Sequence, residues 1–181
     1  MFPILETARL RLRELTINDA EEVYACFSND LVTRYYGMET MRSKEQADEL
    51  LAFFSNSYIG QKGIRWGIER ADQEGIIGTI GFNAWSPKHK RAEIGYELHP
   101  DHWRKGYIAE ALSEVIAYGF HVMDLTRIGA IVFLQNDASI QLLTKMGFTR
   151  EGILSGYMVQ NGIAYDTYVY SLLKEKNSDR V

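Results

Sequence analysis

The spacing of hydrophobic and polar residues predicts about seven β-strands and four α-helices. Strands are expected where apolar and polar residues alternate, or where a short apolar run is bounded by turn residues. The expected strands are residues 8–15, 64–68, 76–82, 92–98, 127–133, 150–159 and 163–173. In the first strand Leu10 and Leu12 alternate with arginines, so we expect one face to be buried and the other solvated. Asn161 and Gly162 join the last two strands and predict a tight hairpin turn.

Four segments carry apolar residues at helical spacing. The expected helices are residues 18–27, 43–58, 107–119 and 137–146. Asn18 with Glu21 predicts a capping box for the first helix, and Ser43 with Gln46 predicts one for the second. On the second helix the apolar residues share a single face. That face consists of Ala47, Leu50, Leu51, Phe54 and Tyr58.

The order of these elements is one strand, two helices, three strands, a helix, a strand, a helix and two strands. Because the three middle strands follow one another directly, the pattern indicates an α+β domain rather than an alternating α/β domain. The length of 181 residues fits one domain, which we expect to span residues 1–181 with a core at about 7–173. The polar tail, residues 174–181, is expected to fray.

Composition excludes several classes of protein. Hydrophobic residues make up 46% of the chain and charged residues 24%, as in ordinary globular proteins. The net charge of -4 argues against nucleic acid or an anionic membrane as a partner. No run approaches the roughly 20 apolar residues of a membrane span, and no signal peptide is recognisable, so we expect a cytoplasmic location. Cys26 is the only cysteine and is expected to be a buried apolar side chain.

A basic turn between a strand and a helix is the first candidate site. The strand at 92–98 runs into Arg104, Lys105 and Gly106, and a helix is expected from Tyr107. A helix N-terminus offers unpaired N–H groups and a positive dipole end, and glycine lets the backbone approach an anion closely. The stretch is therefore suited to phosphate, although an ordinary strand-to-helix turn can have the same composition.

Residues 104–112 resemble the pyrophosphate loop of the GCN5-related N-acetyltransferases. The sequence pattern Trp-x-Lys-Gly-Tyr-x-x-Glu-Ala resembles that of their ribosomal-protein N-terminal acetyltransferase branch. The loop departs from the wider family at Trp103, where Gln or Arg is usual, and at Ile108, where a small residue is usual. The resemblance extends over nearly the whole chain. It implies a mostly antiparallel sheet of about six to seven strands flanked by about four helices, and acetyl-CoA as co-substrate. The residues it assigns to acetyl-CoA here are Leu98, Trp103, Arg104, Lys105, Gly106, Tyr107, Ile108 and Ala109.

Residues 136–148 form a second stretch that resembles the family. Its pattern is Asn-x-x-Ser-x-x-Leu-x-x-Lys-x-Gly-Phe. The resemblance implies that Asn136 binds acetyl-CoA near the thioester, and that Ser139 lies beside the sulfur and returns a proton to the departing thiolate. Taken alone, Asn136 is equally typical of a helix N-cap and Ser139 of an exposed helix hydroxyl.

Acetylation of an amine also requires a base, because the amine must be neutral to attack. Glu93 and Glu97 share one face of the strand at 92–98, with Gly95 between them. We prefer Glu93, because Ala-Glu-Ile-Gly-Tyr resembles the corresponding strand of the ribosomal-protein branch. A surface salt bridge would explain this glutamate equally well. By the same resemblance, the backbone N–H of Leu98 or a neighbour stabilises the oxyanion.

The resemblance implies that the aromatic segment at residues 31–37 helps to form the wall of the acceptor site. Tyr35 and Tyr36 either pack against the helices expected before and after this segment or bind an amine through cation–π contact. Four histidines invite a metal site, but their spacing fits no common zinc pattern, so no metal is expected. They are His89, His99, His102 and His121.

Together these features predict an acetyl-CoA-dependent N-acetyltransferase that acts by direct transfer in a ternary complex. The resemblance points to the N-terminal α-amine of a ribosomal or other protein as acceptor. Two alternatives stay open: an acetyltransferase for a small amine, such as a polyamine, an aminoglycoside or an amino-acid derivative, and a non-catalytic acetyl-CoA-binding sensor. The resemblance also suggests a homodimer.

Overall fold

The strands of the computed structural model, which describes residues 1–174, form one eight-stranded sheet. They are β1 (Leu5–Glu6), β2 (Leu10–Glu14), β3 (Ile64–Arg70), β4 (Gln73–Ser86), β5 (Arg91–Leu98), β6 (Arg127–Phe133), β7 (Thr149–Gln160) and β8 (Ile163–Leu173). Their order across the sheet is β1-β2-β3-β4-β5-β6-β8-β7. Every neighbouring pair is antiparallel except β5 and β6. The predicted α+β class is confirmed, with β1 as an additional short strand. The tail expected to fray lies, from residue 175 onward, outside the described residues.

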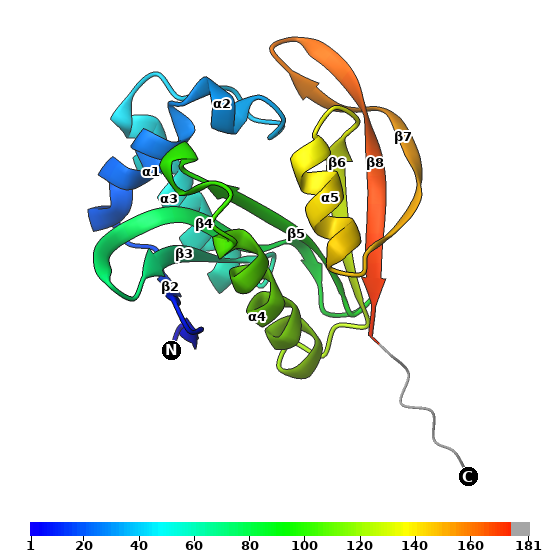
Figure 1. Cartoon of the computed structure of the whole chain (residues 1–181), viewed down its shortest axis with the longest axis horizontal. Helices are drawn as coiled ribbons and strands as arrows, with labels where there is room; N and C mark the ends of the chain where they lie inside the picture. Colours follow the sequence, from blue (N-terminus) through cyan, green and yellow to red (C-terminus); the bar gives the residue numbers. More distant parts are fainter. Residues whose placement is uncertain (175–181) are drawn as a thin grey trace.

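Helices cover both faces of this sheet (Figure 1). They are α1 (Ala20–Phe27), α2 (Asp30–Thr33), α3 (Lys44–Ile59), α4 (Tyr107–His121) and α5 (Asp137–Lys145). The helices α1 and α3 pack on one face, and α4 and α5 lie on the other. Within residues 1–174, no helix is long and apolar enough to cross a membrane.

Local capping signals set where the helices begin. The capping box of Ser43 and Gln46 is present at the start of α3, as predicted. The box expected from Asn18 and Glu21 was wrong: Thr16 and Asp19 form it instead, opening a short 3-10 turn that leads into α1. The short helix α2 was not predicted, because four residues are too few to show helical periodicity.

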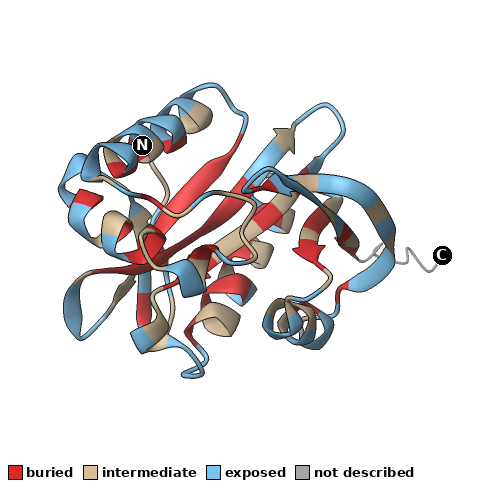
Figure 2. Cartoon of the chain, turned by 90° about the horizontal axis from the view of Figure 1, so that it is seen from above, coloured by how far each residue is buried: buried red, intermediate tan, exposed pale blue. Residues whose placement is uncertain are grey.

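The main hydrophobic core lies between the sheet and α4 (Figure 2). Trp66 and Ile80 on the sheet are fully buried, and so are Leu112 and Val115 on α4. A smaller cluster joins α1 and α3 to the other face of the sheet, and it includes Cys26. The hydrophobic effect therefore fixes both layers of helices to the strands that lead into the site.

The strands β5 and β6 stay together for only three residue pairs. Their pairing runs from Arg91 with Arg127 to Glu93 with Gly129. Beyond Glu93 the two strands pair no further within the described chain, whereas β4 stays paired with β5 as far as Leu98. The sheet is thus split along the second half of β5.

Candidate active site

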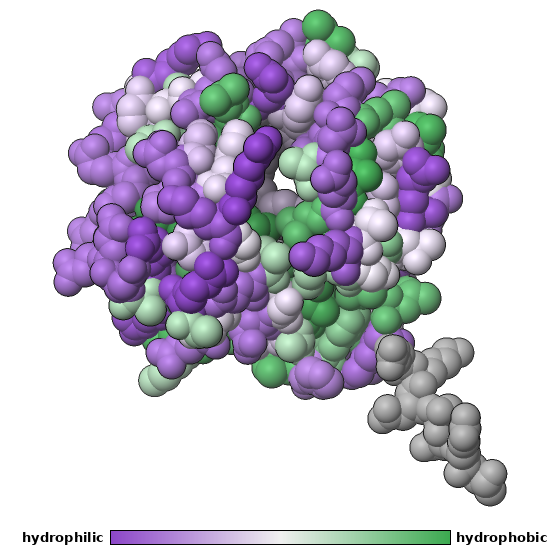
Figure 3. Space-filling view, in the orientation of Figure 1, coloured by the Kyte–Doolittle hydropathy of each residue, from purple (hydrophilic) through white to green (hydrophobic). Residues whose placement is uncertain are grey.

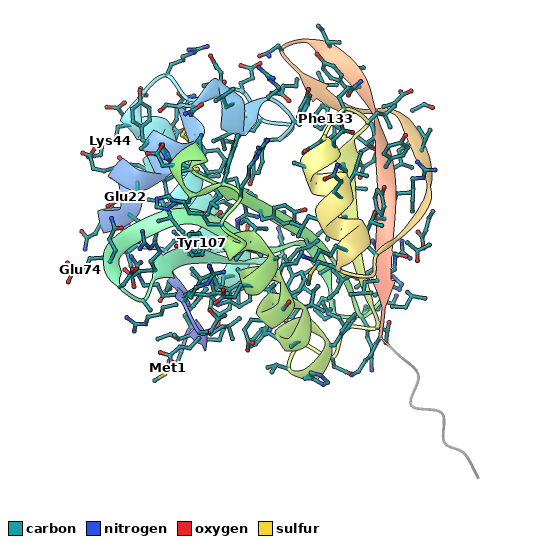
Figure 4. All side chains as sticks on the ribbon, in the orientation of Figure 1. Met1, Glu22, Lys44, Glu74, Tyr107 and Phe133 are labelled. Atoms are coloured by element: carbon teal, nitrogen blue, oxygen red, sulfur yellow. The ribbon has the colours of Figure 1, made fainter. Side chains whose placement is uncertain are left out.

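A cleft of about 790 Å³ opens where β5 and β6 part. Figure 3 shows this face hollowed near its centre, with hydrophilic side chains along the rim and hydrophobic ones inside. Figure 4 labels Tyr107, at the start of α4, and Phe133, at the end of β6, on opposite sides of the opening. The predicted site residues that line the cleft are Tyr35, Tyr36, Glu93, Leu98, Trp103, Arg104, Gly106, Tyr107, Ile108, Ala109, Asn136 and Ser139. The predicted residue outside the lining is Lys105, whose ammonium donates to the carbonyl of Asp101 at 2.8 Å.

Alternation along β5 divides its side chains between the two faces of the sheet. Glu93, Gly95 and Glu97 point toward the face that carries α1 and α3, where Glu97 meets the loop after α2. Tyr96 points toward the other face, where its hydroxyl lies 2.7 Å from the Ser139 hydroxyl on α5. The cleft therefore has different chemistry on its two sides.

The N–H group of Leu98 points into the cleft. Leu98 is opposite Gly78 on β4, and the next ladder bond runs from the His99 N–H to the Ile77 carbonyl at 2.8 Å. In an antiparallel ladder this makes Leu98 and Gly78 a non-hydrogen-bonded pair, so the Leu98 N–H faces away from β4. On that side β6 has already diverged from β5. Within residues 1–174 this donor thus lies unpaired where the strands have separated, at the position that the resemblance assigns to the oxyanion.

The basic turn leads directly into the N-terminus of α4. Gly106 is the N-cap and has a φ of 80°, a left-handed conformation that favours glycine. The first N–H groups of α4 have no partner within the helix. Trp103 donates its indole N–H to the Leu98 carbonyl at 2.7 Å and so ties the turn to the end of β5. The predicted anion site is therefore built from backbone groups held in place by Trp103.

A salt bridge that the sequence did not reveal holds the first turn of α4. Arg9 forms a salt bridge with Glu110 at 2.7 Å and donates to the Lys105 carbonyl at 3.0 Å. Burial would raise the pKa of Glu110, but hydrogen bonds from Thr7 and Arg9 hold that pKa below its ordinary value. The interpretation of Arg9 as only part of a solvated strand face was incomplete, because this arginine braces the turn that leads into α4.

Tyr96 and Ser139 form a hydroxyl pair inside the cleft. Burial raises the pKa of Tyr96 to about 12, with the hydrogen bond to Ser139 acting in the opposite direction. Tyr96 is therefore protonated at neutral pH and able to donate to Ser139. Asn136 accepts a hydrogen bond from the Ser139 N–H at 3.2 Å, so it is an N-cap of α5 that also lines the cleft.

Glu97 lies in a buried network with Arg65. The guanidinium of Arg65 pairs with the Glu97 carboxylate, and both side chains are 2% exposed. Tyr36 donates to Glu97 at 2.7 Å, and Thr79 donates to its other oxygen. Both Glu97 oxygens are therefore already bound, and the Tyr36 hydroxyl attaches its loop to the sheet.

Glu93 stands at the point where the two strands separate. It is half-buried, lines the cleft and faces Gly129 of β6, where an added Cβ would lie 3.5 Å from the Glu93 Cγ. Within the described chain its carboxylate has no hydrogen-bond donor. Of the two glutamates predicted as the base, Glu93 is the one left open to the cleft.

The domain model of the acetyltransferase (GNAT) family matches residues 9–149. The chain belongs to this family. It is an N-acetyltransferase, and its co-substrate is acetyl-CoA. The cleft fits this co-substrate, because the N-terminus of α4 offers backbone donors for phosphate and Leu98 offers an N–H for the acetyl oxygen.

Relatives agree with the GNAT assignment over most of the chain. YoaA of Bacillus subtilis (strain 168), an uncharacterized N-acetyltransferase, is 58% identical over 97% of this chain and 99% of its own length. A spermidine N(1)-acetyltransferase of Vibrio cholerae serotype O1 is 24% identical over 96% of this chain and 98% of its own. A crystal structure of a ribosomal α-N-protein acetyltransferase superposes with a TM-score of 0.86 at 20% identity, covering 96% of each chain. At that identity, the superposition shows the GNAT fold alone.

Replacing Gly106 with alanine should weaken CoA binding about tenfold, because the added Cβ strains the turn whose N–H groups we expect to face the phosphates. Gly162 is the matched control: its φ of 74° is also left-handed, and a Cβ there meets nothing within 4 Å. Both variants carry the same backbone strain, but only Gly162 lies far from the cleft. Isothermal titration with CoA should separate them, and equal affinities in Gly106→Ala and Gly162→Ala would contradict the assigned anion site.

Proposed function

We propose that this GNAT enzyme transfers the acetyl group directly from acetyl-CoA to a primary amine, most favourably the N-terminal α-amine of a ribosomal or other protein. The observation that carries the proposal is the division of groups along β5. A carboxylate, Glu93, lies on one face of the split sheet, and the hydroxyl pair of Tyr96 and Ser139 lies on the other. A base and an acid are thus separated by the cleft in which acetyl transfer takes place.

In this proposal Glu93 removes a proton from the acceptor amine, directly or through one water molecule. A protein α-amine has a pKa of about 7.7–8.0 and a lysine side chain one of about 10.4. Near neutral pH roughly a tenth of the α-amine is already neutral, but less than a thousandth of the lysine amine is. A larger fraction of an α-amine can therefore react without help from a base, so an α-amine is favoured over a lysine side chain as the acceptor.

Acetyl-CoA supplies an activated thioester, and the chain supplies the groups around it. The Leu98 N–H stabilises negative charge on the acetyl oxygen as the amine nitrogen bonds to the acetyl carbon. The carbon–sulfur bond breaks, and the electron pair leaves with the CoA sulfur. Ser139 returns a proton to that sulfur, and the second proton that the attacking nitrogen loses restores the Ser139 hydroxyl. Tyr96 donates a hydrogen bond to Ser139 and keeps its own proton.

Direct transfer is supported by the position of Cys26. This thiol is 3% exposed in the cluster formed by α1 and α3, and it does not line the cleft. Burial also raises the pKa of Cys26, which disfavours the thiolate that an acyl-enzyme would require.

The Glu93→Gln variant should lower turnover about 100-fold near pH 7, because glutamine cannot accept the proton. Affinity for acetyl-CoA should not change. The deficit should shrink as the pH rises toward the pKa of the amine, where more acceptor is neutral without a base. Steady-state rates over this pH range test the role, with Glu74→Gln at the exposed start of β4 as control (Figure 4). Unchanged turnover in Glu93→Gln would exclude Glu93 as the base.

For Ser139→Ala we expect the single-turnover rate to fall roughly ten- to a hundredfold, because the thiolate then leaves without its proton donor. Tyr96→Phe keeps the ring in place and removes only the donor to Ser139, so it should give a smaller loss. Ser113→Ala, on the exposed side of α4, is the control for loss of a helix hydroxyl. A full rate in Ser139→Ala would remove this residue from the mechanism.

The acceptor can be identified with labelled acetyl-CoA and a ribosome preparation that lacks native N-terminal acetylation. We expect one ribosomal protein to gain a single acetyl group at its α-amine, read by intact-protein mass and terminal peptide sequencing. The name of the Vibrio relative makes spermidine the main competing acceptor. CoA release with spermidine but no labelled protein would assign a small amine instead. A rise in melting temperature with acetyl-CoA, but no CoA release with any acceptor, would indicate a binding protein.

A further inference from the structure

Residues 33–38, called the roof below, bridge the two halves of the split sheet over one end of the cleft. Gln160, at the end of β7, is 6% exposed and holds the roof. Its amide donates to the carbonyls of Thr33 at 2.7 Å and Met38 at 3.2 Å, and it accepts from the Gly37 N–H at 3.3 Å. Figure 1 shows the segment after α2 reaching toward the hairpin of β7 and β8. One buried side chain thus fixes the roof at three backbone positions.

Aromatic and close backbone contacts from β6, β7 and β8 also hold the roof. The ring centroids of Tyr35 and Phe133 are 6.1 Å apart, and those of Phe133 and Tyr165 on β8 are 5.4 Å apart. Gly37 has a φ of 78°, and a Cβ there would lie 2.5 Å from the terminal carbon of Met158. The roof backbone is therefore a fixed part of the cleft wall, and its side chains project from defined positions.

Arg34 is the charged side chain that the roof places in the cleft wall. It is exposed, and within residues 1–174 it forms no ion pair. The other two acidic residues of the cleft form no ion pair with it: Glu97 is paired with Arg65, and Asp137, in the first turn of α5, is not within ion-pair distance. Glu93 is the remaining acid and is the proposed base. The roof side of the cleft therefore presents a positive charge that no ion pair within residues 1–174 neutralises.

We propose that Arg34 binds a carboxylate of the acceptor, so that the preferred substrate is a primary amine whose own chain also carries a carboxylate. This inference rests on the proposed acetyl transfer and narrows its acceptor. A guanidinium matches a carboxylate with two parallel hydrogen bonds, which orients the acceptor as well as attracting it. A polyamine would place a second ammonium group near Arg34, where like charges repel. Both an acidic peptide N-terminus and a free amino acid have the required chemistry.

Matched acceptors test this directly. One pair consists of short peptides with the same N-terminal residue, followed by Asp and Glu in one and by Asn and Gln in the other. A second pair is a free amino acid and its amide, and spermidine is the fifth acceptor. For the wild-type enzyme we expect kcat/KM to favour the carboxylate member of a pair about tenfold. The pair that shows the preference distinguishes a peptide from a free amino acid as the source of the carboxylate.

Arg34→Gln should abolish this preference by raising KM for the carboxylate acceptor, while kcat and the KM for acetyl-CoA stay the same. Arg34→Lys should retain part of it, because lysine keeps the charge but loses the bidentate geometry. Arg42→Gln removes an exposed arginine that does not line the cleft, and it should keep the full preference.

Three results would overturn the inference but leave the acetyltransferase proposal intact. They are equal use of acid and amide by the wild type, a preference for spermidine, or a preference that survives in Arg34→Gln. If the wild type acetylates none of the five acceptors and no ribosomal protein, the proposed function itself fails, and the inference fails with it.

Discussion

The early separation of β5 from β6 is the constraint on which the site depends. Three residue pairs hold these two parallel strands together, and the pairing ends at Glu93 and Gly129. A buried peptide group without a partner costs about 1–3 kcal/mol, but the groups released here face an open cleft where a ligand or water can satisfy them. The Leu98 carbonyl is bound by the indole of Trp103, whereas its N–H stays available. The split thus turns ordinary strand hydrogen-bonding groups into a binding surface.

A split sheet would be loose if nothing else joined its halves, and here they are joined at both ends of the opening. The remaining β5–β6 pairs close one end, and the roof held by Gln160 closes the other. The main core fixes α4 to the sheet, and Arg9 fixes the turn before α4 through Glu110. The turn before α4, the Leu98 N–H and the roof therefore belong to one connected frame. Such a frame lowers the entropy lost when two substrates are brought together.

Features that depend on neighbouring residues could be predicted from the sequence. The capping box at Ser43, the Asn161–Gly162 turn and the glycine turn at Gly106 all follow from local chemistry, and the structure has them. The start of α1 was misplaced because Thr16 and Asp19 make the same kind of capping box two residues earlier than Asn18 and Glu21. Contacts between distant segments gave no local signal. Tyr96 and Ser139 are 43 positions apart, and Gln160 and Thr33 are 127 apart, so neither the hydroxyl pair nor the roof could be predicted.

The two glutamates of β5 show how one strand face can carry two functions. Their side chains point toward the same face of the sheet, but only Glu97 is paired with Arg65, and Gly95 between the two glutamates accounts for this difference. Gly95 leaves room for Arg65 to cross from β3, since a Cβ there would lie 3.1 Å from the Arg65 guanidinium, which also donates to the Gly95 carbonyl. The guanidinium therefore reaches Glu97 and neutralises it in the buried layer below α3. Glu93 lies beyond that arginine, beside the side-chain-free surface of Gly129, and stays open to the cleft. A side chain in place of Gly95 would compete with the Arg65 guanidinium for this space. A buried carboxylate that loses its counter-ion is strongly destabilising, so the absence of a side chain at Gly95 helps to keep Glu97 neutralised under α3.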